Sequence, residues 1–499
     1  MRQKKAIINT LCAILQELVA VVSSFIIPRM ILSHFGSTYN GLTTSITQFL
    51  GYAVLLRAGI GGATRAALYK PIAEGDKEKI NGIMAATKKY MKKIALILLA
   101  LIISFACIYP FFVIEEFDYL FSFSLFIIIG ISSFIESMWG INNLILLQAD
   151  QKLYISSISR IISTLLNTLL VVLLINAGFG IHIVKLGSTV ALCLYPLLLH
   201  AYVNRNYKID YSVKPDNAAI SQRWDAFFHQ IANFVMNNTD VMVLTIFSDI
   251  RVVSVYSVYN LISNGIRKLV MNFINGMEAA FGNMIAQNQM DTLKKNFTIV
   301  QFMIFDIATI VYTSAAILIL EFVSIYTKGI HDIDYIRPAF AYLLMLTQFV
   351  GCIRQPYQLV VQAAGHYKQT KYGAMVEPVL NILISIIAVI KFGLVGVVFG
   401  TLAATIFRTV QYSVYVSNNL VKDCMGSFIR MCLISAAEAA ITIFVYRFLP
   451  LGTAQSYFQW GLHGIICIIM TGVVVSLFSF VFNRRELFMT VKKLTRIFK

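Results

Sequence analysis

The chain has 499 residues, of which 58% are hydrophobic and only 13% are charged, and its mean hydropathy is +0.74. Soluble domains carry about a quarter charged residues and stop growing as one core at roughly 250–300 residues, so this composition excludes a single soluble globular domain. The net charge of +17 suggests nucleic acid as a partner only until the positions of the charges are examined.

Apolar segments long enough to cross a bilayer follow one another along the whole chain. A bilayer core needs about 20 mostly apolar residues per helix. The segments that meet this condition are residues 6–33, 40–69, 90–114, 119–149, 155–177, 180–203, 224–247, 252–285, 295–321, 336–364, 370–391, 394–418, 427–450 and 456–482. The sequence therefore predicts an all-α membrane protein with about 14 transmembrane helices.

Lys and Arg are concentrated in alternate loops between these segments. The basic loops lie at residues 2–5, 70–93, 152, 205–223, 294–295, 368–371, 422 and 484–499. They hold roughly 26 basic residues against about four in the opposite loops, so the positive-inside rule predicts a multi-pass protein of the cell inner or plasma membrane with both termini cytoplasmic. This topology explains the charge without nucleic acid, and it makes anionic membrane lipids expected partners.

The chain partly repeats itself. A shift of 214 positions aligns Gln148-Ala149 with Gln362-Ala363 and Leu166-Asn167 with Leu380-Asn381. The shift carries each span onto the span six later, so the two halves are expected to have the same orientation in the membrane. We predict an N-terminal six-helix bundle at 1–203, a cytoplasmic linker at 204–223, a C-terminal six-helix bundle at 224–418, two additional transmembrane helices at 427–482, and a basic cytoplasmic tail at 483–499.

Several basic side chains lie inside the predicted spans. A charge at the bilayer centre costs at least ~2.5–3.5 kcal/mol, so it is expected to face protein or a water-filled cavity. One interpretation is a cationic cavity for an anionic substrate, because the arginine fork binds phosphate with two hydrogen bonds. The other is structural pairing with a buried acid, and basic residues near span ends are expected to snorkel. The candidate acids are Glu17, Glu136, Asp240, Glu278, Asp306, Glu377 and Glu438, and the basic residues near span ends are Arg160, Lys185, Arg430 and Arg447. The substrate-binding candidates are Arg29, Arg57, Arg65, Arg267, Arg354 and Arg408.

Carboxylates inside the spans are scarce and are candidates for coupling transport to an ion gradient. Those expected to bind a proton or Na⁺ are Glu17, Asp240, Glu278 and Asp306. Pairing of each acid with an intramembrane arginine is the alternative. The spacing of Cys and His predicts no metal site, and no cofactor is expected beyond coupling to a proton or sodium gradient.

Three stretches carry a resemblance to a known family. They are PRMILSHFGSTYNGL at 28–42, LLRAGIGGATRAAL at 55–68 and EGDKEK at 74–79. With them the chain resembles polysaccharide flippases of the Wzx type, within the multidrug/oligosaccharidyl-lipid/polysaccharide flippase superfamily. Many relatives have an acidic residue ahead of the glycines in the second span, where this chain has Arg57.

The resemblance implies a function in surface polysaccharide biosynthesis. The expected substrate is an undecaprenyl-pyrophosphate-linked oligosaccharide, flipped from the cytoplasmic to the external leaflet by alternating access. Contacts with polysaccharide assembly proteins are also implied.

Two other functions compete with this one. A cation-coupled multidrug exporter of the same fold would be expected to have an acid-lined, apolar pocket, and the arginines argue against it. A membrane polysaccharide polymerase or glycosyltransferase would need a substantial external loop, whereas the acidic stretches at 115–118 and 331–334 are short. We therefore do not expect an enzyme, and no catalytic residue is assigned.

Overall fold

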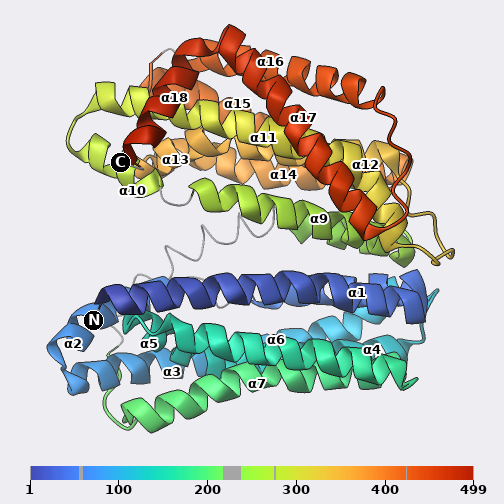
Figure 1. The fold of residues 1–499 in the computed structure, drawn as a ribbon. Helices are drawn as coiled ribbons and strands as arrows, with labels where there is room; N and C mark the ends of the chain where they lie inside the picture. The colour runs from blue at the N-terminus through green and yellow to red at the C-terminus, as the bar shows by residue number, and fades with distance from the viewer. Residues whose placement is uncertain (1, 55–59, 217–237, 275–276, 423, 498–499) are drawn as a thin grey trace. The chain divides into compact units, whose positions relative to one another are not determined.

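A computed structural model describes residues 2–54, 60–216, 238–274, 277–422 and 424–497. Within these ranges every regular element is a helix (Figure 1). Ten of the described helices are long and apolar enough to cross a membrane. The predicted all-α class is confirmed, and the chain is a multi-pass membrane protein.

The chain divides into two compact units, Met1–Ser254 and Val255–Lys499. This division falls later in the chain than the linker predicted at 204–223. The short apolar helix Asn238–Phe247 groups with the first unit, where the Ser45 and Thr245 hydroxyls lie 2.7 Å apart. The predicted grouping into bundles of six helices stays a prediction.

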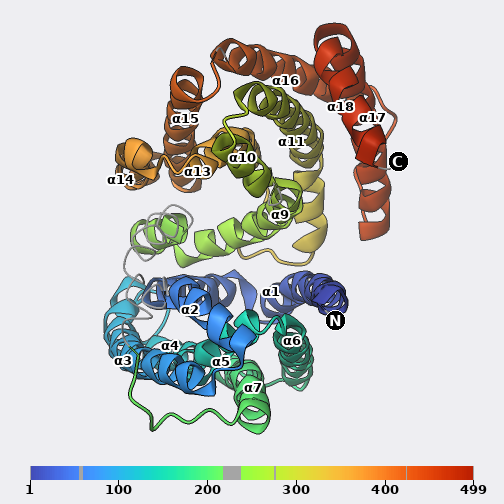
Figure 2. The ribbon, with the colours of Figure 1, turned by 90° about the vertical axis from the view of Figure 1, so that its left-hand side faces the viewer.

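The first unit is built from long helices that lie side by side. They are α1 (Arg2–Val54), α2 (Ile60–Glu74), α3 (Lys77–Ile108), α4 (Tyr119–Ile135), α5 (Ile141–Ala149), α6 (Leu153–Asn176) and α7 (Ile181–Tyr207). Helix α6 packs against both α1 and α7, as the end-on view in Figure 2 shows. Helix α1 contains the first predicted span and part of the second, and Gly36, with φ of 84°, bends the chain between them. A positive φ suits glycine because it has no Cβ.

The second unit repeats this kind of packing. Its helices are α9 (Ile250–Ile274, whose first residues belong to the first unit), α10 (Met277–Ala286), α11 (Met290–Tyr326), α12 (Pro338–Ile353), α13 (Gln355–Ala363), α14 (Tyr367–Phe392), α15 (Leu394–Asn419), α16 (Cys424–Tyr446), α17 (Tyr457–Phe482) and α18 (Arg484–Ile497). Helix α15 packs along α14 and also against α12, while α11 packs against α12, α16 and α17. Large apolar side chains on the outer faces are exposed, for example Ile390 at 71%, as expected of helices in lipid.

One span in each unit is interrupted. In the first unit a single π-helical turn, Glu136–Gly140, separates α4 from α5. In the second unit Arg354 alone separates α12 from α13, whose first turn contains Pro356. Proline lacks a backbone N–H, so Pro356 removes one helical hydrogen bond at this break. In both places the interruption lies beside a charged side chain.

Candidate functional site

Two arginines and one glutamate meet in the interior of the second unit. Arg354 lies at the break between α12 and α13, Glu377 lies on α14 and Arg408 lies on α15. The Arg354 Nη1 atom donates a hydrogen bond to Glu377 Oε1 at 2.5 Å, and Arg408 Nε lies 3.6 Å from Glu377 Oε2. The three side chains are 17%, 11% and 4% exposed, respectively. This is a buried charge cluster in which one carboxylate is in ionic contact with two guanidinium groups.

Arg408 is held by further contacts with its own helix and with α14. It donates to the Thr370 carbonyl oxygen at 3.0 Å, to the Gln411 side-chain oxygen, and to the Tyr412 hydroxyl at 2.7 Å. Its guanidinium group also lies 4.1 Å from the centre of the Tyr412 ring. Gly373 on α14 makes room for this arrangement, because a Cβ there would collide with the side chains of Gln411 and Arg408.

Positive charge exceeds negative charge at this cluster. Arg267 on α9 is half-buried and lies near enough to Arg354 for the two like charges to interact. Glu377 is the only acid in ionic contact with Arg354 or Arg408 among the described residues. The Nε atom of Arg354 is buried and has no hydrogen-bond partner in the described part of the chain. The geometry therefore leaves capacity for an additional anionic group.

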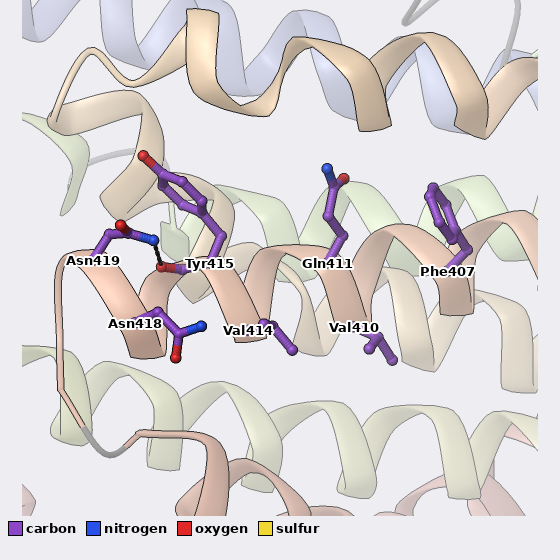
Figure 3. Close-up of a pocket in the computed structure, with 7 residues that line it drawn as sticks. All are labelled: Phe407, Val410, Gln411, Val414, Tyr415, Asn418 and Asn419. Carbon is purple, nitrogen blue, oxygen red and sulfur yellow. Dashed lines mark hydrogen bonds between the residues drawn. The ribbon is translucent and has the colours of Figure 1, made fainter.

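A groove of about 540 Å³ runs along α15 (Figure 3). Gln411 lines the groove and also accepts the hydrogen bond from Arg408. Tyr415 lines it too, and its hydroxyl lies 2.8 Å from His366 Nδ1. The groove thus combines apolar, aromatic and amide groups, and its lining residues are Phe407, Val410, Gln411, Val414, Tyr415, Asn418 and Asn419.

The structure brings together three of the six predicted substrate-binding arginines, namely Arg267, Arg354 and Arg408. Arg354 and Arg408 also pair with Glu377, which is the structural alternative stated above. Arg29 lies half-buried on α1 of the first unit, and Arg65 on α2 donates to the Gln148 side chain of α5 at 3.2 Å. Arg57 lies outside the described residues. A role of these arginines in binding substrate stays a prediction.

The four predicted ion-coupling acids do not form one cluster. Glu17 is exposed on α1, and Asp240 is buried on the helix Asn238–Phe247, where its charge acts on Tyr52. Asp306 on α11 accepts a hydrogen bond from Ser479 at 3.1 Å. The side chain of Glu278 lies outside the described residues. Their role in coupling also stays a prediction.

The snorkelling of Arg160 to a membrane surface stays a prediction. Arg160 on α6 donates to Glu136 in the π-helical turn at 2.8 Å, and its guanidinium group lies 3.5 Å from the centre of the Tyr195 ring on α7. Sequence analysis missed Gln411 and Tyr412. Their spacing of three and four residues after Arg408 was a usable signal, because residues at these spacings share a helix face.

Comparison with known proteins gives matches in fold but not in sequence. No protein-family model matches the chain, and no curated protein matches it. The lipid II flippase MurJ, in an inward closed conformation, superposes with a TM-score of 0.73 and 15% identity, over 96% of this chain and 100% of that chain.

Multidrug transporters match as well. An inward-facing multidrug resistance MATE family transporter of the MOP superfamily superposes with a TM-score of 0.61 and 15% identity, over 80% of this chain and 95% of that chain. The MATE multidrug transporter DinF-BH gives a TM-score of 0.56 and 17% identity, over 83% of this chain and 95% of that chain. At this identity the likeness establishes the fold.

Proposed function

Since the chain has the fold of the multidrug/oligosaccharidyl-lipid/polysaccharide flippase superfamily, we propose that it is a polysaccharide flippase of the Wzx type. Its substrate is an undecaprenyl-pyrophosphate-linked oligosaccharide, which it moves from the cytoplasmic to the external leaflet. Both termini are cytoplasmic, and alternating access comes from movement of one six-helix bundle against the other.

The observation that carries this proposal is the excess of buried positive charge in the second unit. Arg354 and Arg408 share the carboxylate of Glu377, and the charge of Arg267 acts on that of Arg354. Guanidinium groups bind phosphate oxygens with paired, charge-assisted hydrogen bonds. A pyrophosphate headgroup would neutralise the charge that Glu377 leaves unmatched, whereas a cationic drug would be repelled.

The groove on α15 supports the oligosaccharide part of the substrate. The side chains of Gln411, Asn418 and Asn419 offer hydrogen-bond donors and acceptors for sugar hydroxyl groups, and Tyr415 offers a ring face. Gln411 joins this groove to Arg408, so sugars bound there would lie beside the pyrophosphate.

A cation-coupled multidrug exporter is the second candidate. The fold likeness to MATE transporters favours it, because this fold also carries multidrug transport. The two candidates predict opposite charge preferences, so one experiment separates them.

The experiment measures transport by purified protein in proteoliposomes. One arm supplies an undecaprenyl-pyrophosphate oligosaccharide with a fluorescent sugar, and the other supplies a cationic dye. We expect flipping of the lipid-linked sugar and no transport of the dye. Arg267→Ala, Arg354→Ala and Arg408→Ala should each lower flipping by roughly 10- to 150-fold, since a hydrogen bond to a charged group contributes about 1.5–3 kcal/mol.

Two comparisons keep the result interpretable. Arg→Lys at the same sites should restore flipping only in part, because lysine keeps the charge but loses the fork. Arg251→Ala, which removes a loop ion pair with Glu116 in the first unit, should leave flipping near the parental rate. Parental flipping by all three well-folded alanine variants, or transport of the dye alone, would overturn the proposal.

A further inference from the structure

A second group of buried polar side chains lies where α16 and α17 pack against α11 in the second unit. Asp306 on α11 accepts a hydrogen bond from Ser479 on α17 at 3.1 Å. Glu438 on α16 is only 1% exposed, and its charge interacts with that of Asp306. Two carboxyl groups from different helices therefore lie near each other in the interior.

A hydroxyl group lies about one helical turn from each acid. Ser435, Glu438 and Thr442 share one buried face of α16, at a spacing of three and four residues. On α11, Thr309 lies one turn after Asp306 and donates a hydrogen bond to Ser435 at 2.9 Å. This Thr309–Ser435 pair therefore lies on the same helix faces as the two carboxyl groups.

Two polar atoms of this face have no hydrogen-bond partner in the described part of the chain. They are Oε1 of Glu438 and Oγ1 of Thr442, and Thr442 is 0% exposed. Unsatisfied buried polar atoms are rare in native proteins and call for a bound ligand, water or proton. A proton on a carboxyl group turns an acceptor into a donor and removes the penalty of a buried charge.

Several charged groups on the surrounding helices form ion pairs with residues other than the two acids. Arg430 on α16 bonds to Glu486 of α18 at 2.9 Å, and His463 on α17 lies 3.1 Å from Glu321 of α11. Arg408 of α15 is in contact with Glu377, as described above. Lys294 and Lys295 begin α11, about three turns before Asp306. No lysine or arginine in the described part of the chain is in salt-bridge contact with Asp306 or Glu438.

We propose that Asp306 and Glu438 form a coupled proton-binding site between α11 and the pair of helices α16 and α17. Protons from water form O–H bonds with the carboxylate oxygens and return to water on release, with no other reactant. The interaction between the two acids makes the proton occupancy of one depend on the other. This deepens the ion-coupling role that the sequence predicts for Asp306 by naming the ion and the second acid, and it rests on the proposed transport function.

The test uses infrared spectroscopy of the full-length protein in lipid nanodiscs, so it does not depend on transport. Wild-type protein at neutral pH should show the carbonyl band of protonated carboxyl groups, with a shift in D₂O. Asp306→Asn and Glu438→Gln should each remove part of this band and change the pH at which the remainder disappears. The double variant should lose the contribution entirely.

Glu377→Gln provides a matched control, because that buried acid is paired with arginines and should contribute no such band. The amide substitutions keep the shape of the side chains. If only one of the two single variants folds, that variant is sufficient for the test. A band that persists unchanged in both single variants would overturn the proposal. The proposal would also be overturned if the band of protonated carboxyl groups were absent and the carboxylate signal changed when Na⁺ replaced choline. That result would indicate a sodium site. A failed flipping assay with these infrared results intact would count only against the proposed function.

Discussion

Each unit has a charge cluster beside a break between two helices, but the two clusters balance their charges differently. In the first unit, Arg160 on α6 faces one acid, Glu136, and lies over the Tyr195 ring. In the second unit, Glu377 on α14 faces two arginines, from the α12–α13 break and from α15. The first arrangement joins one arginine to one acid, and the second places two arginines on one acid. We therefore expect a structural role for the first, and the second supports the binding role proposed above.

The sharpest test of this comparison removes the acid from each unit. We expect Glu377→Gln to lower the free energy of unfolding by about 3–5 kcal/mol, because it leaves buried arginines without a counter-charge. Glu136→Gln should lower it by about 1 kcal/mol or less, since Arg160 and Glu136 are 34% and 28% exposed. Thermal unfolding of both variants in the same detergent measures the difference. Equal losses would mean that the two clusters do not differ in kind.

A smaller effect is expected from filling the space that holds Arg408 in place. Gly373→Ala would push a methyl group against Gln411 and Arg408, and overpacking of this kind lowers stability by typically about 1–3 kcal/mol. Gly472 on α17 is the matched control, because a Cβ there meets nothing within 4 Å. Gly472→Ala should be neutral or stabilising by up to about 1 kcal/mol, as expected for alanine in a helix. A stabilised Gly373→Ala variant would contradict the packing described here.

The hydroxyl groups of the tyrosines in the two clusters have different partners, and removing each hydroxyl tests this difference. Tyr412→Phe removes an acceptor of a hydrogen bond from Arg408 and should lower stability by about 1.5 kcal/mol and also slow flipping. Tyr195 instead pairs with the Ser156 hydroxyl at 3.0 Å, so Tyr195→Phe leaves its ring beneath Arg160. This variant should lose about 1 kcal/mol or less and keep the parental flipping rate. Flipping that is slowed equally by both changes would remove the functional distinction.

The smallest effect is expected at an ion pair outside the spans. Burial alone raises the pKa of the Asp150 carboxyl group. Hydrogen bonds from Lys152 and Tyr207, and the charges of Lys152 and Lys5, lower this pKa by more, so it lies below its ordinary value. A lowered acid pKa stabilises the fold above the unfolded pKa near ~3.9, and this contribution is lost as pH falls through the folded pKa. Asp150→Asn should therefore lower the melting temperature slightly at pH 7. The difference from wild type should shrink below about pH 4, and a constant difference across the titration would contradict the assignment.

The sequence by itself determined the class of the protein and the order of its helices. A bilayer imposes a minimum length of apolar segment, and that length can be counted along the chain. Most of the predicted span 90–114 lies in α3 and the short turn after it, and nearly all of the predicted span 456–482 lies in α17. The hydrogen bond removed at Pro356 is likewise a local property, because the missing N–H belongs to that residue.

Only the tertiary structure decided which charges meet. Arg354 and Glu377 are 23 positions apart and Arg160 and Glu136 are 24 apart, so helix packing, and not periodicity within one helix, brings them together. The sequence left open whether such arginines pair with buried acids, and the structure shows that Arg354 and Arg160 each bond to an acid on a neighbouring element. Sequence analysis identified Asp306 but could not pair it with Glu438, because they lie on α11 and α16. Hydropathy records whether a residue is in the membrane, and it carries no information on which neighbouring helix that residue faces.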